Sequence, residues 1–329
     1  MSHVEGPESM LIIRLGAMGD ILHALPAAAS LKRSFPERRV FWTMTPKWMP
    51  LVEGNPFIDE VVPFDRRDAR VLMSCWRRLR EVRPEWAIDF QGLIQSALVG
   101  RAALPKQLIG FDKAFVREPL AAALYSRRLA PAAAHVVDRN LELVASAGAN
   151  VLTRESWVPA GRDEGALPQG RFVLTNPMAG WKSKQWPLAN YQVVAKRLQK
   201  EGVQLVANVP RHLAAELAEL KEVRLHSSSI AGLIAATRRA SAVLGLDSGP
   251  LHLAAALHKP GVALFGPTDP ARNGPYGGTI RVIRVADAQT TYKRGDEIHS
   301  SMKQIRPEQV AEELLQCLAN SGSEEEVHL

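Results

Sequence analysis

Short apolar runs alternate with segments of helical periodicity along the chain, and this alternation restricts the possible folds more than any other feature. Residues 11–15 have the continuous apolar character of a buried strand, and Leu22, Leu25 and Leu31 lie near helical spacing within 21–33. Such alternation predicts a parallel sheet covered by helices on both faces. The other elements predicted in the first half are strands over 40–44, 60–64 and 86–90 and a helix over 69–82.

A polar stretch with Gly and Pro over residues 160–170 interrupts the alternation, and we interpret it as an interdomain linker. Two domains also fit the length, because 329 residues exceed what a single core usually holds. Beyond the linker, the predicted strands are 172–176, 204–208, 242–246 and 261–265, and the predicted helices are 188–200, 213–221, 230–239 and 250–257.

The predicted fold class is therefore α/β, with two Rossmann-like doubly wound domains facing a central cleft at the carboxyl ends of their strands. The first domain is expected over 1–160 and the second over 161–306. Residues 307–329 are expected to form a C-terminal helix and tail, for which the first domain is a candidate packing partner.

The composition argues for a globular protein of a reducing compartment. Hydrophobic residues make up 46% and charged residues 23% of the chain. Cys75 and Cys317 are far apart and lack metal-ligand spacing, so neither a disulfide framework nor a metal site is expected. The first ten residues contain acids and no apolar core, and no apolar run is long enough to span a bilayer, so we expect a cytoplasmic location.

The chain has a formal net charge of +7, and seven arginines lie between residues 66 and 83. Such a segment indicates an anionic partner, which charge alone leaves open among nucleic acid, an anionic membrane surface and a phosphorylated substrate. A solvated helix face is the simpler alternative. The arginines are Arg66, Arg67, Arg70, Arg77, Arg78, Arg80 and Arg83.

The turn over residues 245–252 follows a predicted strand and begins a predicted helix. Its backbone N–H groups and the helix dipole form an anion site that suits a diphosphate. Ser248 can donate a hydroxyl, Gly249 permits close approach, and His252 lies one turn further along the helix. The alternative is a helix cap formed by Asp247 or Ser248, which does not account for His252.

A second turn, over residues 15–20, follows the first predicted strand but lacks both the Walker lysine and the GxGxxG spacing. Asp20 would repel a phosphate there, so the loop is expected to face a neutral hydroxyl. This makes Asp20 a candidate general base. Alternatively, Asp20 only caps the helix, which would contribute about 1 kcal/mol.

Two further candidates follow strands of the second domain. Lys184 lies between a predicted strand and a predicted helix, where a lysine can neutralise a leaving diphosphate. An isolated loop lysine is, however, more often only solvated. Thr268 lies in the turn after the strand over 261–265, and turn chemistry alone would explain the composition of that turn.

Several long motifs occur in a defined order: LGAMGDILHALPA, IDFQGLIQSALVGR, REPLAAALYSRR, KQWP and GLDSGPLHLAAALHKPGVALFGPTDP. With them the chain resembles, nearly end to end, the lipopolysaccharide heptosyltransferases of glycosyltransferase family 9, which are inverting enzymes of the GT-B type. The first-domain motifs are most similar to heptosyltransferase I. Such enzymes transfer L-glycero-D-manno-heptose from ADP-heptose to the first Kdo of Kdo2-lipid A in inner-core lipopolysaccharide biosynthesis.

The resemblance implies a role for each candidate. Asp20 is implied to deprotonate the acceptor hydroxyl and Lys184 to assist the departure of the diphosphate, without a metal or another cofactor. The residues implied to bind the donor are Lys184, Asp247, Ser248, Gly249, His252, Thr268 and Glu216. The residues implied to bind the acceptor are Gly19, Arg66, Arg67, Arg117 and Arg139.

The chain departs from the family pattern near the nucleoside. Ala179 and Gly180 stand where the family has threonines, and residues 210–214 stand where a ribose-binding Glu is expected, so that Glu216 is the nearest acid. The implied partners are ADP-heptose, the anionic glycolipid acceptor and the cytoplasmic face of the inner membrane, contacted peripherally.

Other functions remain open on the sequence. One is a transferase for a later core heptose or another nucleotide sugar. From a different class, the chain could be a non-catalytic nucleotide or nucleic-acid binder, although only Trp76 is interleaved with the arginines and no nucleic acid is expected as a partner. A two-domain NAD enzyme is disfavoured by the missing GxGxxG.

Overall fold

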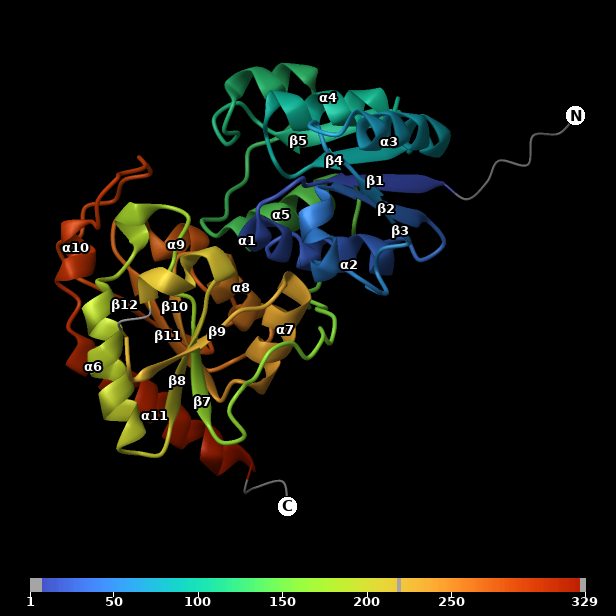
Figure 1. The fold of residues 1–329 in the computed structure, drawn as a ribbon. Helices are drawn as coiled ribbons and strands as arrows, with labels where there is room; N and C mark the ends of the chain where they lie inside the picture. The colour runs from blue at the N-terminus through green and yellow to red at the C-terminus, as the bar shows by residue number, and fades with distance from the viewer. Residues whose placement is uncertain (1–7, 218–219, 326–329) are drawn as a thin grey trace, which may run out of the picture. The chain divides into compact units, whose positions relative to one another are not determined.

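The computed structural model describes residues 8–217 and 220–325, without the side chains of residue 216 and residues 321–325. The chain divides into two compact units, Met1–Pro159 (unit 1) and Ala160–Leu329 (unit 2). Each unit is built around a six-stranded parallel sheet (Figure 1). The α/β class predicted from the alternation is confirmed.

The sheet of unit 1 has the strand order β3-β2-β1-β4-β5-β6, the order of a doubly wound nucleotide-binding fold. Its strands are β1 Ser9–Ile13, β2 Arg39–Met44, β3 Glu60–Pro63, β4 Trp86–Asp89, β5 Gln107–Phe111 and β6 Arg127–Leu129. Its helices are α1 Met18–Leu22, α2 Leu25–Ser34, α3 Ala69–Val82, α4 Ile94–Ala102 and α5 Val136–Ser146, with the 3-10 helices η1 Pro46–Leu51 and η2 Pro119–Leu124.

Helices cover both faces of this sheet. The inward side chains of α3, α4 and η2, such as Leu79, Ala97 and Ala121, share one apolar core with Leu11 and Ile13 of β1. Helices α2 and α5 pack against each other on the other face (Figure 1). All the strand pairs are parallel, so the loops that follow the strands lie along one edge of the sheet.

Unit 2 repeats the same topology, with the strand order β12-β11-β10-β7-β8-β9. Its strands are β7 Phe172–Thr175, β8 Gln204–Asn208, β9 Val223–His226, β10 Ala242–Leu246, β11 Gly261–Phe265 and β12 Ile280–Arg284. Its helices are α6 Leu188–Gln199, α7 Ile230–Arg239, α8 Gly249–Ala256, α9 Pro270–Asn273, α10 Ser300–Lys303 and α11 Pro307–Glu325, with η3 Lys182–Lys184 and η4 Arg211–Leu217.

The helix predicted over 21–33 is divided into α1 and α2. Pro26 lies in the first turn of α2, where its missing N–H and fixed φ favour a helix start and disfavour continuation from the preceding turn. The helix predicted over 213–221 is the short η4, and residues 218–219 lie outside the described residues.

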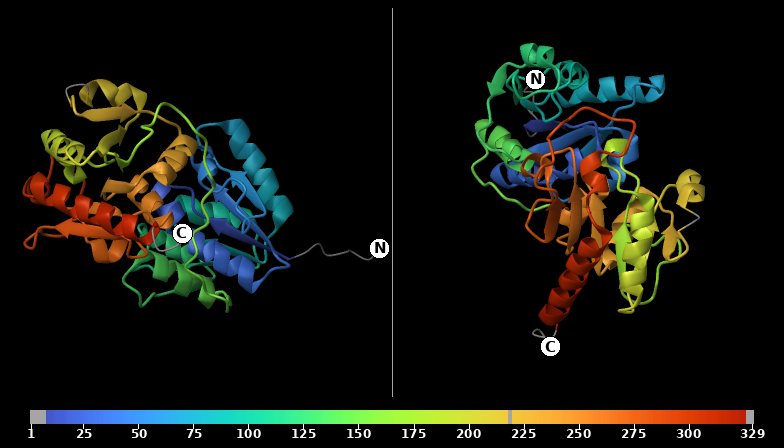
Figure 2. Two further views of the ribbon diagram at one scale, coloured as in Figure 1. Left: turned by 90° about the horizontal axis from the view of Figure 1, so that it is seen from below. Right: turned by 90° about the vertical axis from the view of Figure 1, so that its left-hand side faces the viewer.

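The C-terminal helix α11 belongs to unit 2. It packs against α6 and the strands β10 and β11, and Val310, Leu314 and Leu318 are buried in the core of this unit (Figure 2). The apolar face of α11 is thus used within unit 2, and the expectation that the segment also packs on the first domain stays a prediction. Of the predicted tail, residues 326–329 lie outside the described residues.

The polar stretch predicted as a linker is fastened to unit 2. The Arg162 N–H donates to the Ala231 carbonyl at 3.0 Å. The Glu164 carboxylate accepts from the backbone N–H and the hydroxyl of Ser229 at 2.7 and 2.6 Å, and these bonds hold the pKa of Glu164 below its usual value. Glu164 therefore occupies the N-terminus of α7.

Candidate active site

Three loops of unit 2 meet because they follow three neighbouring parallel strands. Lys184 lies in the loop after β7, Asp247 directly follows β10, and Thr268 lies in the loop after β11. The sheet order places β10 between β7 and β11. Carboxyl ends of parallel strands share one edge of a sheet, so residues more than 60 positions apart in sequence come into contact there.

Asp247 is the centre of this cluster. Its Oδ2 accepts from the Lys184 Nζ at 2.5 Å and from the Thr268 hydroxyl at 2.6 Å. Its Oδ1 lies 3.9 Å from the Nε2 of His252. Asp247, Thr268 and His252 are 8%, 2% and 6% exposed, so the charge-assisted contacts lie in a region of reduced screening.

Lys184 also contacts an aromatic ring. Its Nζ lies 4.4 Å from the centroid of the Trp181 ring, within the range of a cation–π interaction. The Trp181 ring also lies 5.5 Å from the guanidinium carbon of Arg294. The ammonium group is therefore held between a carboxylate and a ring, with only 15% of the side chain exposed.

The N-terminus of α8 follows Asp247 directly in sequence, so it lies beside the carboxylate that holds the Lys184 ammonium group. Ser248 is the N-cap residue, but its hydroxyl donates to the Leu246 carbonyl at 3.2 Å and makes no capping bond to the helix. Ser248 thus has the N-cap position of the alternative interpretation, but its side chain does not supply the capping bond. Gly245 is needed below this turn, since a Cβ there would lie 2.6 Å from the Leu251 side chain.

The arrangement can bind an anion through Lys184, the Ser248 hydroxyl and the first backbone N–H groups of α8. A carboxylate repels a diphosphate, so the chemistry of Asp247 suits holding Lys184 and Thr268 in place or accepting from a sugar hydroxyl.

Asp20 of unit 1 is in the first turn of α1, at its third position and not at the N-cap. Its Oδ2 accepts from the backbone N–H of Ala17 at 3.2 Å and lies 2.5 Å from Nη2 of Arg14, which also donates through Nη1 to the Phe90 carbonyl at 2.6 Å. The Asp20 side chain remains 37% exposed. The carboxylate is thus oriented by two donors while still open to solvent.

The buried carboxylate of Asp89 stabilises the end of β4, the strand next to β1. Asp89 is fully buried at the end of β4 and accepts from Ser96 and Tyr125, both at 2.7 Å, and from the backbone N–H of Gln91 at 2.8 Å. Burial raises the pKa of Asp89, and the hydrogen bonds oppose this effect. Gln91 then accepts from the backbone N–H of Leu15 at 2.7 Å, which ties the turn before Asp20 to β4.

A family model described as glycosyltransferase family 9 (heptosyltransferase) matches residues 72–302. The chain belongs to this family. Lipopolysaccharide heptosyltransferase 1 of Pseudomonas aeruginosa is 32% identical over 290 residues, which cover 82% of this chain and 81% of that protein. The enzyme of the same name from Escherichia coli is 27% identical over 304 residues, covering 84% and 93%.

Solved structures agree with the fold of this family 9 glycosyltransferase. The E. coli heptosyltransferase WaaC with ADP-2-deoxy-2-fluoro heptose has a TM-score of 0.72 at 23% identity, covering 92% of this chain and 98% of that chain. The E. coli ADP-heptose lps heptosyltransferase II has a TM-score of 0.77 at 25% identity, covering 95% and 99%. The predicted GT-B type fold and the predicted enzyme class are thereby confirmed.

The residues expected to bind the acceptor follow strand ends of unit 1, as Asp20 does. Arg66 and Arg67 lie exposed after β3, and Arg117 lies exposed after β5. Arg139 lies in the first turns of α5, where its Nε donates to the Ala133 carbonyl at 2.9 Å. Gly19 is buried within α1. The parallel sheet therefore distributes the three exposed arginines along the edge that carries Asp20.

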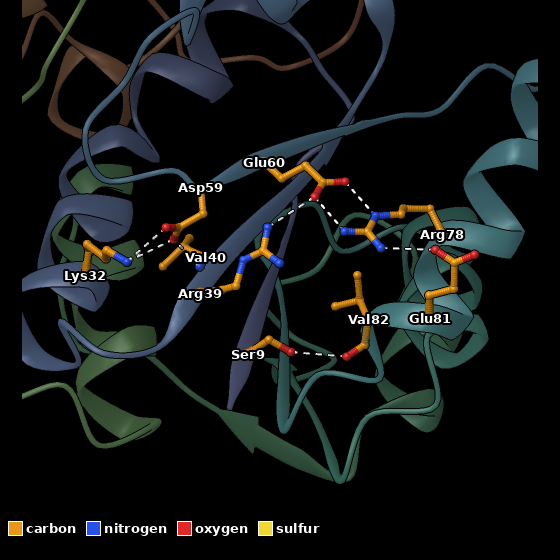
Figure 3. Close-up of polar contacts among 9 residues, drawn as sticks. All are labelled: Ser9, Lys32, Arg39, Val40, Asp59, Glu60, Arg78, Glu81 and Val82. Atoms are coloured by element: carbon orange, nitrogen blue, oxygen red, sulfur yellow. Dashed lines mark hydrogen bonds and ion pairs between the residues drawn. The ribbon is translucent and has the colours of Figure 1, made fainter. Parts of the chain in front are cut away.

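Arg78 is distinct from the other arginines of residues 66–83, because its guanidinium is engaged inside the unit (Figure 3). Nε and Nη2 each donate to the Glu60 carboxylate at 2.6 Å, and Nη1 donates to Glu81 at 3.0 Å. The bonds from Arg78 hold the pKa of Glu60 below its usual value. Arg78 is thus a link between α3 and β3.

Sequence reasoning missed Arg14, Trp181 and the Asp89 cluster of the family 9 glycosyltransferase. Arg14 ends the apolar run of β1, which was a signal that a charged group is placed at this strand end. Trp181 and Asp89 gave no comparable signal, because their partners come from other segments. The side chain of Glu216, the expected ribose ligand, lies outside the described part of the structure.

A hollow of about 550 Å³ lies beside the strand ends of β8 and β9 and is lined by Glu164, Gly165, Arg211 and Ser227–Ser229. No group of three or more His, Cys, Asp or Glu side chains that could hold a metal occurs among the described residues. The described part of the chain contains no helix that is both long and apolar enough to cross a bilayer.

Proposed function

We propose that this family 9 glycosyltransferase transfers L-glycero-D-manno-heptose from ADP-heptose to the first Kdo of Kdo2-lipid A, as a step of lipopolysaccharide core biosynthesis. The observation that carries the proposal is the 32% identity to a lipopolysaccharide heptosyltransferase 1 over most of both chains. The solved E. coli heptosyltransferase WaaC with ADP-2-deoxy-2-fluoro heptose supports ADP-heptose as the donor.

The donor diphosphate binds at Lys184 and the N-terminus of α8 in this proposal. In the structure, the Lys184 Nζ lies 2.5 Å from Asp247. When the donor binds, the ammonium group contacts both Asp247 and the phosphates. Ser248 and Gly249 bring hydroxyl and backbone donors to the phosphates, and His252 and Thr268 complete the wall of the site. The nucleoside occupies the neighbouring hollow at Arg211, where Glu164 supplies a carboxylate for hydroxyl groups.

The reaction is an inverting displacement at the anomeric carbon. Asp20 accepts the proton of the acceptor hydroxyl as the new bond forms, and Arg14 orients its carboxylate. Lys184 and the α8 dipole stabilise the charge that develops on the leaving ADP, so no divalent ion is required. Arg66, Arg67, Arg117 and Arg139 bind the acidic groups of the acceptor, and Gly19 leaves room for it beside Asp20.

The test is mass spectrometry of the product formed by the purified chain from ADP-heptose and Kdo2-lipid A. We expect the acceptor to gain one heptose residue, with the same yield in the presence of EDTA. No product with ADP-heptose would overturn the donor assignment, and a product that disappears with EDTA and returns with Mg²⁺ would overturn the metal-independent mechanism. A panel of other nucleotide sugars serves as the matched control.

A second candidate is the transfer of a later core heptose. The observation that favours it is the likeness to the E. coli ADP-heptose lps heptosyltransferase II, with a TM-score of 0.77. An acceptor that already carries one heptose separates the two candidates. Faster transfer to that acceptor than to Kdo2-lipid A would replace the first assignment by the second.

We further propose that the enzyme works in the cytoplasm on the inner face of the membrane, which it contacts peripherally. The support is the lipid-borne acceptor together with the exposed arginines near residue 66. Cell fractionation tests this location: we expect the enzyme in the membrane pellet at low salt and in the supernatant after a high-salt wash. Full recovery in the supernatant at low salt would contradict it.

A further inference from the structure

The outward side of α3 in unit 1 carries arginines and an exposed methionine in a single stripe. Arg70, Met73, Arg77 and Arg80 are three or four residues apart, so they share one face of the helix. All four are exposed, and Met73 is 66% exposed. The opposite face of the helix enters the core through Cys75. The stripe is therefore turned away from the sheet.

Two neighbouring elements add apolar side chains to the same surface. Leu98 of α4 is 50% exposed, and Leu120 of η2 is 72% exposed. Helix α4 lies beside α3 (Figure 1) and also packs against η2. The inward side chains of all three elements enter one core, so their outward sides belong to one layer. We define the α3–η2 face by Arg70, Met73, Arg77, Arg80, Leu98 and Leu120.

The exposed apolar residues of unit 1 are concentrated in this layer. Within its described residues, nine large apolar side chains are exposed, and five of them lie on α3, α4 or η2. Helices α1, α2 and α5 contribute none of these nine side chains. A concentration of apolar side chains on one side of a unit marks an interaction surface.

The charges of this layer are arranged unequally. Asp68 accepts from the first backbone N–H groups of α3, and Glu118 accepts from the N–H of Ile94 at 2.7 Å. Glu81 is paired with Arg78. Within the described residues, by contrast, the three arginines of the α3–η2 face make no ion pair. The acidic side chains of this layer are thus bound to partners within the unit, whereas the positive charges of the face point to solvent.

We propose that the α3–η2 face is a membrane-docking surface that seats on an anionic phospholipid bilayer. Met73, Leu98 and Leu120 enter the boundary between headgroups and acyl chains, and the arginines of α3 contact the lipid phosphates. The inference rests on the proposed lipid-borne acceptor and extends it, because salt-sensitive attraction alone leaves the exposed apolar side chains without a role.

A bilayer fits this face better than RNA. Met73, Leu98 and Leu120 gain from an acyl environment but offer no ring for base stacking, and Trp76 is the single exposed aromatic residue of α3. Arginines that flank apolar residues on one helix face are typical of interfacial helices. Competition with single-stranded RNA in the binding assay decides between the two partners.

Flotation of the full chain with vesicles is the first test. We expect binding to phosphatidylglycerol–phosphatidylcholine vesicles and much weaker binding to phosphatidylcholine alone. Met73→Gln with Leu98→Gln should lower the partition coefficient by about tenfold, and each Arg→Gln change at Arg70 or Arg77 by about fivefold. The matched controls in unit 2, Val193→Gln and Lys200→Gln, should leave it unchanged.

A site-specific probe is the second test, because it reports insertion and not only attraction. Native Cys75 and Cys317 are buried, so a cysteine introduced by Met73→Cys can be labelled selectively with an environment-sensitive fluorophore. Its emission should shift to the blue on anionic vesicles, whereas a label at Val193→Cys should not respond. The proposal would be overturned by equal responses at both positions or by no shift at position 73. It would also be overturned if single-stranded RNA displaced the enzyme from the vesicles.

Transfer to a deacylated, water-soluble acceptor separates this inference from the proposed function. We expect the Met73→Gln, Leu98→Gln variant to keep wild-type kcat/KM on the soluble acceptor and to lose activity on vesicle-borne acceptor. Wild-type enzyme that binds vesicles but transfers no heptose to either acceptor would refute the proposed function alone. Wild-type enzyme that transfers heptose but does not float would refute the docking surface and the proposed peripheral contact, but not the proposed heptose transfer.

Discussion

Lys184 and Asp247 form an ion pair at 2.5 Å across two neighbouring strand ends, although 63 positions separate them in sequence. The pair lies beside the N-terminus of α8, and Thr268 donates to the same carboxylate oxygen. The carboxylate therefore fixes where the ammonium group stands before any ligand arrives. Preorganised charge of this kind costs no reorganisation when a diphosphate leaves.

The variant Lys184→Met should lose about 10- to 100-fold in kcat/KM for ADP-heptose, because a charge-assisted contact to the diphosphate is removed. Isothermal titration with ADP should show a similar loss in affinity. Lys182, exposed two positions earlier, provides the matched control Lys182→Met. Equal effects of the two substitutions would show that Lys184 is only a solvated lysine.

Removing Lys184 also leaves Asp247 with one donor fewer, so the single variant should lose stability. The double variant Lys184→Met, Asp247→Asn should recover most of that loss, since the unpaired carboxylate is then absent. Activity should stay low in the double variant. Urea unfolding of the four proteins of this cycle measures the recovery, and additive losses would contradict the coupling.

The variant Asp20→Asn should lower kcat by about 10²- to 10⁴-fold while the affinity for ADP stays unchanged. Asparagine is nearly isosteric and keeps an oxygen for the Ala17 N–H and Arg14, so the turn should be preserved. The control is Glu37→Gln at an exposed acid of the same unit. Near-normal turnover of Asp20→Asn would show that Asp20 is not the general base and only stabilises the start of α1.

The sequence predicts the second sheet well, because its strands are continuous apolar runs that end at polar turns. The strands over 204–208, 242–246 and 261–265 have the bounds that the periodicity indicates. The loop residues Lys184, Asp247 and Thr268 could be named as candidates on the same basis, since each follows a strand. That these three residues contact one another follows from the order of the strands in the sheet. The apolar pattern of each segment, taken alone, does not reveal this order.

Other features depend on partners that sequence periodicity does not reveal. The split between α1 and α2 depends on Pro26, and the attachment of residues 160–170 to unit 2 depends on the bond between Glu164 and Ser229. The stretch of arginines was uniform in sequence, but the structure divides it. Arg78 is bound to Glu60, whereas Arg70 and Arg77 are directed outward.

The Arg78–Glu60 link predicts a stability difference that depends on pH. Arg78 lowers the pKa of Glu60 in the folded protein, so the link contributes fully above the unfolded value of about 4.3 and is lost as pH falls through the lower folded pKa. Both side chains are about one third exposed, so we expect Arg78→Gln to cost about 1 kcal/mol at neutral pH.

Urea unfolding at pH 7 and at pH 3 measures this difference between Arg78→Gln and the wild type. The difference in free energy of unfolding between the two proteins should be smaller at pH 3 than at pH 7. Arg80→Gln is the matched control, because Arg80 is exposed on the same helix and makes no ion pair within the described residues. A gap of the same size at both pH values would mean that Arg78 stabilises α3 through packing alone.

Tyr125 should stabilise the strand end that supports Asp20. Its hydroxyl donates to the fully buried Asp89 at 2.7 Å, and Asp89 holds the Gln91 turn that bonds to Leu15. The variant Tyr125→Phe leaves this carboxylate with one donor fewer and should lower the unfolding free energy by about 1–3 kcal/mol. Tyr292→Phe, at an exposed tyrosine, is the control.

The same variant separates support of Asp20 from general stability. If the Asp89 cluster positions the turn before Asp20, Tyr125→Phe should lower kcat at a temperature where the variant is still fully folded, while the affinity for ADP in unit 2 stays unchanged. A loss of stability with unchanged kcat would limit the cluster to the fold of unit 1. Tyr125→Phe combined with Asp89→Asn should regain stability, because the amide no longer requires compensation for a buried charge.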